Sequence, residues 1–181
     1  MSETEILVKI AKLLDQLNID YMLTGSFALQ MYGESRMTRD IDIVIELSEA
    51  QASQMLPVFS KDFYIAPELI QLAMQDGSMF NIIHFKPMLK VDFILKKNIA
   101  LHQSQFNRRK KITVLDYPVN VISPDDLIIA KLLWAKDTRS PMQIEDIRLL
   151  LKDRAAGLDT DYIQRWVAEL GLETILAEVR Q

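Results

Sequence analysis

The sequence predicts an α/β fold, in which a mixed β-sheet is flanked by helices and followed by a C-terminal helical part. Short apolar runs with the two-residue period of strands alternate with segments of helical period as far as residue 122. Beyond that point the apolar positions recur only at helical spacing. We therefore expect an α/β core over residues 1–122 and a helical part over residues 123–181, packed on the core within one domain or as an appendage.

The first three elements should be a helix, a strand and a second helix. Apolar residues recur every three or four positions from Glu3 to Leu17, which predicts an amphipathic helix. Residues 21–23 are apolar and precede Thr24-Gly25-Ser26, a pattern typical of a buried strand that ends in a tight turn. A short helix over residues 27–32 then ends at Gly33.

The next strand carries two acids on one of its faces. The segment RDIDIVIE, from Arg39 to Glu46, alternates strictly between apolar and mostly polar positions. Its isoleucines share one face, and the opposite face begins with Asp40 and Asp42. Both carboxylates should therefore point away from the core on the same side of the sheet.

Capping residues, prolines and alternation predict the remaining elements. A capping-box pair, Ser48 and Gln51, begins a helix, and Pro67 begins another. Pro57 marks an irregularity near the end of the first. The core is completed by helices over 48–59 and 67–75, strands over 79–85 and 90–95, a helical segment over 98–109, and a hairpin over 112–123 that turns at 116–118. The C-terminal helices are expected over 124–137, 141–152, 159–169 and 171–179.

Composition excludes several kinds of site. The chain has no cysteine and only two histidines, which excludes disulfides, thiolate sites and imidazole-rich zinc centres. Carboxylate oxygen remains as the metal ligand, and it suits hard ions such as Mg²⁺ or Mn²⁺. The net charge of −4 argues against broad electrostatic adhesion to nucleic acid.

The sequence predicts a cytoplasmic protein without a membrane partner. No stretch approaches the roughly 20 consecutive apolar residues that span a bilayer. The N-terminus reads MSETEILVKI, which is acidic where a signal peptide is basic.

Three acids and a Gly-Ser turn form the candidate site. Asp40 and Asp42 lie close enough on one strand face to share a divalent ion. An isolated D-x-D pair is more often a solvated strand face. Here a third acid, Asp92, sits within KVDFIL on a separate strand, and Gly25-Ser26 stands where a strand passes into a helix whose free N–H groups favour phosphate.

These residues resemble the nucleotidyltransferase superfamily typified by DNA polymerase beta, whose signature is a Gly-Ser helix start, a D-x-D pair and a later strand acid. The stretch TGSFALQMYGESRMTRDIDIVIE is more similar to small stand-alone members, including those of toxin–antitoxin and abortive-infection systems. The segment SPDDLIIAKLLWAKDTRSPMQIEDIRLLL resembles their C-terminal helical part, so the likeness covers most of residues 20–152.

The resemblance implies a role for each signature residue. Asp40 and Asp42 would hold two Mg²⁺ ions, or Mn²⁺, that bridge the triphosphate of a nucleotide such as ATP. Asp92 would ligate the ion that carries the attacking hydroxyl and accept its proton. Gly25 and Ser26 would hold the terminal phosphates. The implied reaction is in-line transfer of NMP to a hydroxyl of a protein, an RNA or a small molecule, with release of pyrophosphate.

Lys131 is the one charge in an otherwise apolar stretch of predicted helix, from Leu127 to Ala135. It must extend its ammonium to solvent, pair with an acid such as Asp146, or reach a phosphate of the ligand. The first two outcomes are structural, and the third makes Lys131 a nucleotide-binding residue.

Other polar residues near the signature are also candidates for nucleotide binding. Arg36 and Arg39 flank the acids and could neutralise phosphate charge, although loop arginines are more often solvated. Thr38 shares the strand parity of the acids and could contact the ligand or cap the strand. The basic run over residues 107–111 either guides an RNA acceptor or is a solvated face.

Two other functions stay open beside the transferase. The chain could be a non-catalytic module that keeps the fold and binds a nucleotide or a partner protein, such as an antitoxin. It could also be a metal-dependent phosphohydrolase, but triphosphate binding explains the Gly-Ser turn ahead of the D-x-D pair better. Release of pyrophosphate that depends on Mg²⁺ separates the transferase from the binding module.

Overall fold

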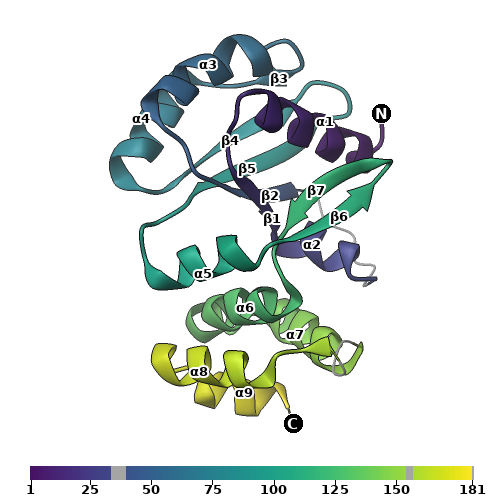
Figure 1. The fold of residues 1–181 in the computed structure, drawn as a ribbon, viewed down its shortest axis with the longest axis vertical. Coiled ribbons are helices and arrows are strands. Elements are labelled where there is room, and N and C mark those ends of the chain that lie inside the picture. Colours follow the sequence, from purple (N-terminus) through teal and green to yellow (C-terminus); the bar gives the residue numbers. More distant parts are fainter. Residues whose placement is uncertain (34–39, 154–156, 181) are drawn as a thin grey trace. The chain divides into compact units, whose positions relative to one another are not determined.

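The protein forms two compact units (Figure 1). The computed structural model describes residues 1–33, 40–153 and 157–180. The first unit comprises Met1–Phe27 and Arg36–Ile122, and the second comprises Ala28–Ser35 and Ser123–Gln181. The division at Ile122 falls where strand-forming sequence gives way to helices.

Helices and strands alternate up to Val121. In chain order they are α1 (Glu3–Gln16), β1 (Tyr21–Thr24), α2 (Gly25–Met31), β2 (Asp40–Ile45), α3 (Glu49–Phe59), β3 (Phe63–Tyr64), α4 (Pro67–Asp76), β4 (Met79–His84), β5 (Leu89–Leu95), α5 (Ala100–Arg108), β6 (Lys110–Val114) and β7 (Tyr117–Val121). The helices α6 (Pro124–Thr138), α7 (Pro141–Asp153), α8 (Thr160–Leu170) and α9 (Glu173–Val179) follow. The predicted α/β class is confirmed.

Within the described residues the strands form one seven-stranded mixed sheet, ordered β3-β4-β5-β2-β1-β7-β6. Strand β2 occupies the middle position, antiparallel to β1 and parallel to β5. The pairs β3–β4, β4–β5 and β6–β7 are antiparallel, whereas β1 and β7 are parallel. Because β2 and β5 are neighbouring parallel strands, the start of β2 lies beside the first half of β5, with Asp42 opposite Asp92.

Local chemistry explains where several elements begin and end. The side chain of Ser48 accepts a hydrogen bond from the backbone N–H of Gln51, and the Gln51 side chain accepts from the N–H of Ser48, which is the predicted capping box of α3. The β6–β7 hairpin turns at Leu115 and Asp116, both with positive φ, which is typical of a two-residue type I′ turn. The predicted turn at 116–118 was therefore placed too late, since Pro118 is already part of β7.

The first unit is held by apolar side chains on the inner face of β2 and its neighbours. The isoleucines of β2 are fully buried, as its alternation predicts: Ile41, Ile43 and Ile45. On β5, Phe93 is also fully buried, and its ring contacts Phe59 of α3 and Phe80 of β4 at centroid distances of 5.8 and 5.3 Å. This aromatic cluster fixes the back of the strand that presents Asp92.

The second unit is built around α6, which contacts α7, α8 and α9. Ser123 caps α6, and its hydroxyl donates to the buried carboxylate of Asp126 at 2.6 Å. Asp126 also accepts from the Tyr162 hydroxyl of α8 at 2.6 Å, and Asp125 accepts from the backbone N–H of Asp159 at 2.8 Å. These buried acids therefore join helices, which gives them a structural role.

No helix among the described residues is long and apolar enough to cross a membrane.

The one described strand that the sequence did not predict is β3, whose two residues are too few to show alternation.

Phe93→Ala is expected to lower the free energy of unfolding by about 3–5 kcal/mol, because it opens a cavity in the aromatic cluster behind β5. Phe85→Ala is the matched control, since this phenylalanine of the same unit is 51% exposed and should change stability by less than about 0.5 kcal/mol. Urea unfolding followed by circular dichroism measures both. Equal losses in the two variants would contradict the assigned core.

Candidate active site

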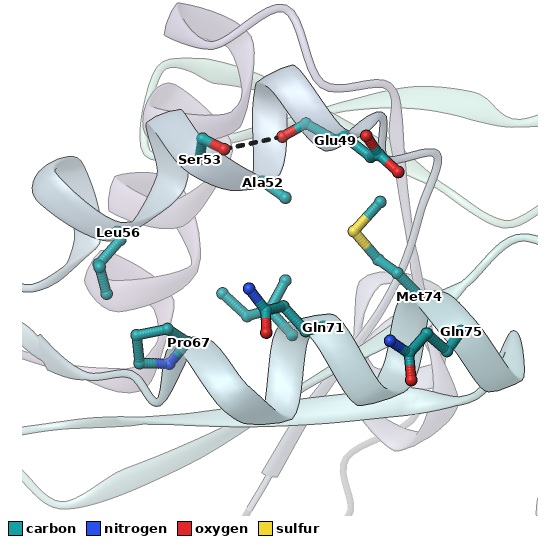
Figure 2. Close-up of a pocket in the computed structure, with 9 residues that line it drawn as sticks. Glu49, Ala52, Ser53, Leu56, Pro67, Gln71, Met74 and Gln75 are labelled. Carbon is teal, nitrogen blue, oxygen red and sulfur yellow. Dashed lines mark hydrogen bonds between the residues drawn. The ribbon is translucent and has the colours of Figure 1, made fainter.

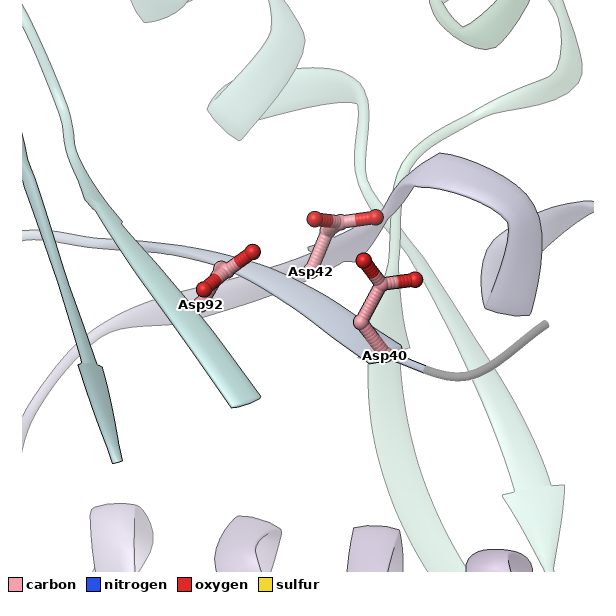
Figure 3. Close-up of side chains that lie close together, drawn as sticks. All are labelled: Asp40, Asp42 and Asp92. Atoms are coloured by element: carbon pink, nitrogen blue, oxygen red, sulfur yellow. The ribbon is translucent and has the colours of Figure 1, made fainter. Parts of the chain in front are cut away.

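The pairing of β2 with β5 brings the three predicted acids together (Figure 3). Asp42 lies directly opposite Asp92 in the parallel register, and Asp40 lies opposite Lys90. Residues that share a register position project to the same side of a sheet. Figure 3 shows the three carboxylates on one side of the two strands.

The carboxylates form one cluster. A carboxylate oxygen from each of Asp40, Asp42 and Asp92 lies within 4.8 Å of the other two. Asp40 and Asp42 are half-buried, and Asp92 is buried with 4% of its surface exposed. The Oδ1 atom of Asp92 is buried and has no hydrogen-bond partner among the described residues. Burying an acceptor without a partner costs free energy, so a hydrogen-bond donor or a cation bound to this atom would stabilise the site.

Lys90 brings a positive charge to the cluster. Its Nζ lies 2.7 Å from Oδ2 of Asp92 and 3.9 Å from Oδ2 of Asp40. The hydrogen bond to Asp92 is the main reason that the pKa of the Lys90 ammonium lies above its ordinary value. Burial of the ammonium opposes this shift, and the charges of the three acids add to it. Lys90 therefore stays protonated and offsets part of the repulsion among the carboxylates.

Gly25 leaves room for Asp42. A Cβ atom added at Gly25 would lie 2.0 Å from Oδ2 of Asp42, closer than any real contact. Gly25 also has a φ of +65°, which L side chains rarely adopt. The contact arises because β1 pairs with β2 and places Thr24, the residue before Gly25, opposite Asp42. The Asp42 carboxylate thus lies directly beside Gly25, and the predicted contact of the Gly25 backbone with a phosphate stays a prediction.

The donor set fits a hard divalent cation. It consists of carboxylate oxygens from two adjacent strands. One of these oxygens, Oδ1 of Asp92, is buried and has no partner in the described part of the chain. Mg²⁺ and Mn²⁺ prefer such ligands, and they are usually held by one or two carboxylates together with substrate phosphates. Asp40, Asp42 and Asp92 are the residues that would hold the ions.

Lys131 lies in the second unit, where it makes the ion pair that the sequence analysis named as one of its alternatives. Its Nζ donates to Oδ2 of Asp146 on α7 at 2.8 Å and to Oε1 of Gln143 at 3.1 Å. The Lys131 and Asp146 side chains are 4% and 1% exposed. Lys131 therefore joins α6 to α7, and its contact with phosphate stays a prediction.

The other predicted nucleotide-binding residues are Ser26, Arg36, Thr38 and Arg39. Ser26 is buried in the first turn of α2, directly after Gly25. Arg36, Thr38 and Arg39 lie outside the described residues.

The basic run 107–111 is divided among several elements. Arg109 pairs with Asp20 at 2.6 Å and stacks on the ring of Phe106. Lys110 and Lys111 are exposed on the edge strand β6. That the basic run guides an RNA acceptor stays a prediction.

A separate groove of about 900 Å³ lies between α3 and α4 (Figure 2). Its lining mixes apolar and amide side chains and contains none of the acids of the cluster: Glu49, Ala52, Ser53, Leu56, Pro67, Ile70, Gln71, Met74 and Gln75. The hydroxyl of Ser53 donates to the backbone carbonyl of Glu49 at 3.0 Å, as a helical serine commonly does. The groove is therefore distinct from the carboxylate cluster.

The sequence analysis missed two residues beside the acids. Lys90 stands two positions before Asp92 on β5, and this spacing was the signal that could have placed it on the same face. Asn81 of β4 lies opposite Asp92 in the antiparallel register, so its amide belongs to the same face. Asn81 carried no sequence signal, because the pairing of β4 with β5 had first to be known.

A family model described as aminoglycoside-2''-adenylyltransferase matches residues 6–124, about two thirds of the chain. The matched segment contains Gly25, Ser26, Lys90 and the three acids, and it ends before Lys131. No curated protein matches the chain.

Solved structures of nucleotidyltransferases share the fold. An antigenic nucleotidyltransferase-like protein from Paracoccidioides brasiliensis is 18% identical, with 97% of this chain and 90% of that chain covered and a TM-score of 0.60. ANT(2'')-Ia in complex with adenylyl-2''-tobramycin is 14% identical, with 93% and 97% covered and a TM-score of 0.56. The lincosamide antibiotic adenylyltransferase LnuA, bound to lincomycin, is 17% identical, with 84% and 98% covered and a TM-score of 0.51.

Gly25→Ala is expected to abolish divalent-ion binding at the cluster, because the added methyl group displaces the Asp42 carboxylate. Gly77→Ala is the matched control: Gly77 has a similar φ of +59°, but an added Cβ meets nothing within 4 Å. Both variants should lose about 1–2 kcal/mol of stability to the positive φ. Calorimetric titration of Mn²⁺ into each protein separates them, and unchanged binding by Gly25→Ala would contradict the close packing of Asp42.

Lys131→Met is expected to lower the free energy of unfolding by about 3–5 kcal/mol, because Asp146 would lose its ammonium partner while staying buried. Lys152→Met, at an exposed lysine of α7, is the control and should change little. Adding Asp146→Leu to Lys131→Met should restore much of the lost stability. Thermal unfolding measures all three proteins, and a wild-type melting temperature for Lys131→Met would contradict the structural role of the pair.

Proposed function

Because the chain belongs to the aminoglycoside-2''-adenylyltransferase family, we propose that it transfers a nucleoside monophosphate, in the first instance AMP from ATP, to a hydroxyl group of a small molecule. The observation that carries the proposal is the carboxylate cluster of Asp40, Asp42 and Asp92, in which the buried Oδ1 of Asp92 has no hydrogen-bond partner among the residues that the structure describes. Such a cluster suits the two-cation chemistry of phosphoryl and nucleotidyl transfer.

The roles proposed for the residues are those that the sequence resemblance implies, and the convergence of the three carboxylates supports them. Asp40, Asp42 and Asp92 would hold the divalent ions. Asp92, on the neighbouring strand, would accept the proton of the acceptor hydroxyl. Divalent cations supply charge neutralisation and lower the pKa of the attacking hydroxyl when they are bound. Gly25 leaves room for Asp42. We assign contacts with the nucleotide to the residues that the sequence resemblance and spacing named: Gly25, Ser26, Arg36, Thr38, Arg39 and Lys131.

The proposed reaction balances as a substitution at the α-phosphorus. The acceptor oxygen forms a bond to the α-phosphorus. The bond between the α-phosphorus and the oxygen that bridges to the β-phosphate lies in line with this new bond and breaks. The electron pair of the broken bond leaves with pyrophosphate. Positioning and electrostatic stabilisation provide most of the catalysis in reactions of this kind.

Support for a small-molecule acceptor comes from the proteins that share the fold. ANT(2'')-Ia was solved in complex with adenylyl-2''-tobramycin, and the lincosamide antibiotic adenylyltransferase LnuA was solved with bound lincomycin. This chain is of similar length to both, since more than nine tenths of each is covered. An aminoglycoside or lincosamide panel is therefore the first set of acceptors to assay, ahead of a protein or an RNA.

The toxin–antitoxin association stays a prediction that rests on the sequence resemblance. The competing function is a module that binds a nucleotide or a partner protein without turnover. Pyrophosphate release separates this module from the proposed enzyme.

The Asp42→Asn variant is expected to lose at least about a hundredfold in affinity for its NTP in the presence of Mg²⁺, because changes even in residues that only support metal ligands cost ten- to a hundredfold. Calorimetric titration of each NTP, with and without Mg²⁺, measures the effect and identifies the preferred base. The same preparations, mixed with the acceptor panel, are assayed for pyrophosphate.

Asp76→Asn is the matched control, since Asp76 is an exposed acid at the end of α4. It should bind as the wild type does. If Mg²⁺-dependent NTP binding persists in Asp42→Asn, the assigned cluster is wrong. If binding depends on Asp42 but no acceptor yields pyrophosphate, the non-catalytic module becomes the better account.

A further inference from the structure

Lys90 occupies a place within the carboxylate cluster that the proposed reaction does not explain. Its ammonium donates to Oδ2 of Asp92 at 2.7 Å and lies 3.9 Å from Oδ2 of Asp40, so it bridges acids from two strands. The same two carboxylates belong to the group whose oxygens converge within 4.8 Å. The ammonium therefore lies against ligands that a divalent ion would need.

The two oxygens of Asp92 are in different situations. Oδ2 is engaged by Lys90, whereas Oδ1 is buried and has no partner among the described residues. One monovalent ammonium thus satisfies the carboxylate only in part. A small divalent cation carries twice the charge and bonds to several oxygens at once, so it would satisfy the cluster more fully.

We propose that Lys90 is a tethered counter-cation, which holds the carboxylate cluster together before the divalent ions bind and which those ions must displace. The proposal rests on the function proposed above, since it concerns the same metal site. Lys90 is a positioning residue in this scheme, because it acts on the ligands of the ions.

The side chain of Lys90 can make this movement. It is 45% exposed, compared with 6% for Asp92, so its four-carbon stem has solvent into which it can turn. The backbone at Asp92 is held in place, because the next residue, Phe93, is packed in the aromatic cluster on the opposite face of β5. Displacement would therefore move the lysine and leave the carboxylate in place.

The proposal has a consequence for metal affinity. Each divalent ion that binds must break the Lys90–Asp92 hydrogen bond and overcome the repulsion of a nearby positive charge. Removing the charge should strengthen metal binding in the absence of nucleotide. Removing the charge should also lower the free energy of unfolding of the metal-free protein, because the carboxylates would then repel one another without compensation.

The test is calorimetric titration of Mg²⁺, without nucleotide, into the wild type and Lys90→Gln. The variant is expected to bind Mg²⁺ about tenfold more tightly, an estimate for the loss of one partly exposed charge pair. Its melting temperature should be lower than that of the wild type without Mg²⁺ and should rise more when Mg²⁺ is added.

Two further variants isolate the charge at this position. Lys90→Arg keeps a positive charge and should bind Mg²⁺ within about twofold of the wild type. Lys111→Gln makes the same change in net charge on the exposed edge strand β6, four strands away from β5 in the sheet order, and should bind as the wild type does. Equal or weaker Mg²⁺ binding by Lys90→Gln, compared with the wild type, would overturn the proposal.

A second measurement uses the unaltered side chain, so it does not depend on the stability of a variant. The ¹⁵N resonance of the Lys90 ammonium, identified by its absence from Lys90→Arg, should shift when Mg²⁺ is added to the wild type. Mg²⁺ binding without this shift would overturn the proposed displacement of Lys90 and would leave the metal site in place. Failure of every protein to bind Mg²⁺, with or without NTP, would overturn the metal site and the proposed function with it.

Discussion

The parallel pairing of β2 with β5 is the constraint on which the site depends. Asp40 and Asp42 are two residues apart on one strand, but Asp92 follows some fifty residues later in the chain. Only the register that sets Asp42 opposite Asp92 makes them neighbours. The same register sets Ile43 opposite Phe93, so the core and the acid cluster are fixed by one set of backbone hydrogen bonds. Apolar burial on one side of the sheet therefore stabilises the concentration of negative charge on the other.

The close approach of three carboxylates carries an electrostatic cost. Two unit charges about 4 Å apart repel by roughly 1 kcal/mol in water and by about 4 kcal/mol at the effective dielectric of a protein surface. Lys90 offsets part of this repulsion, and Gly25 removes the side chain that would force Asp42 out of the cluster. These two neighbours therefore help to preorganise the cluster. Within the described residues, the buried Oδ1 of Asp92 still lacks a hydrogen-bond partner.

Much of the fold could be predicted because its elements are long enough to show a period. The alternation of RDIDIVIE gave the burial of β2 residue by residue, and capping residues located the start of α3. The two-residue strand β3 is too short for any period. Strand order was beyond the sequence as well, since it depends on contacts between distant segments, and Asn81 was missed for that reason. Lys90 was missed although its spacing from Asp92 in the sequence places both on one strand face. Lys131 had three possible outcomes, and the choice of Asp146 required the packing of α7 on α6.

The alternation within β2 also limits how the gene can change. Core and site positions alternate along the same six residues, from Asp40 to Ile45. Inserting or deleting one residue there would turn the isoleucines toward solvent and the aspartates toward the core, because a shift by one position reverses every side chain of a strand. Substitutions can be absorbed singly, whereas a change of length in this strand would remove the fold and the site together. We therefore expect length variation among relatives of this chain to fall in the loops.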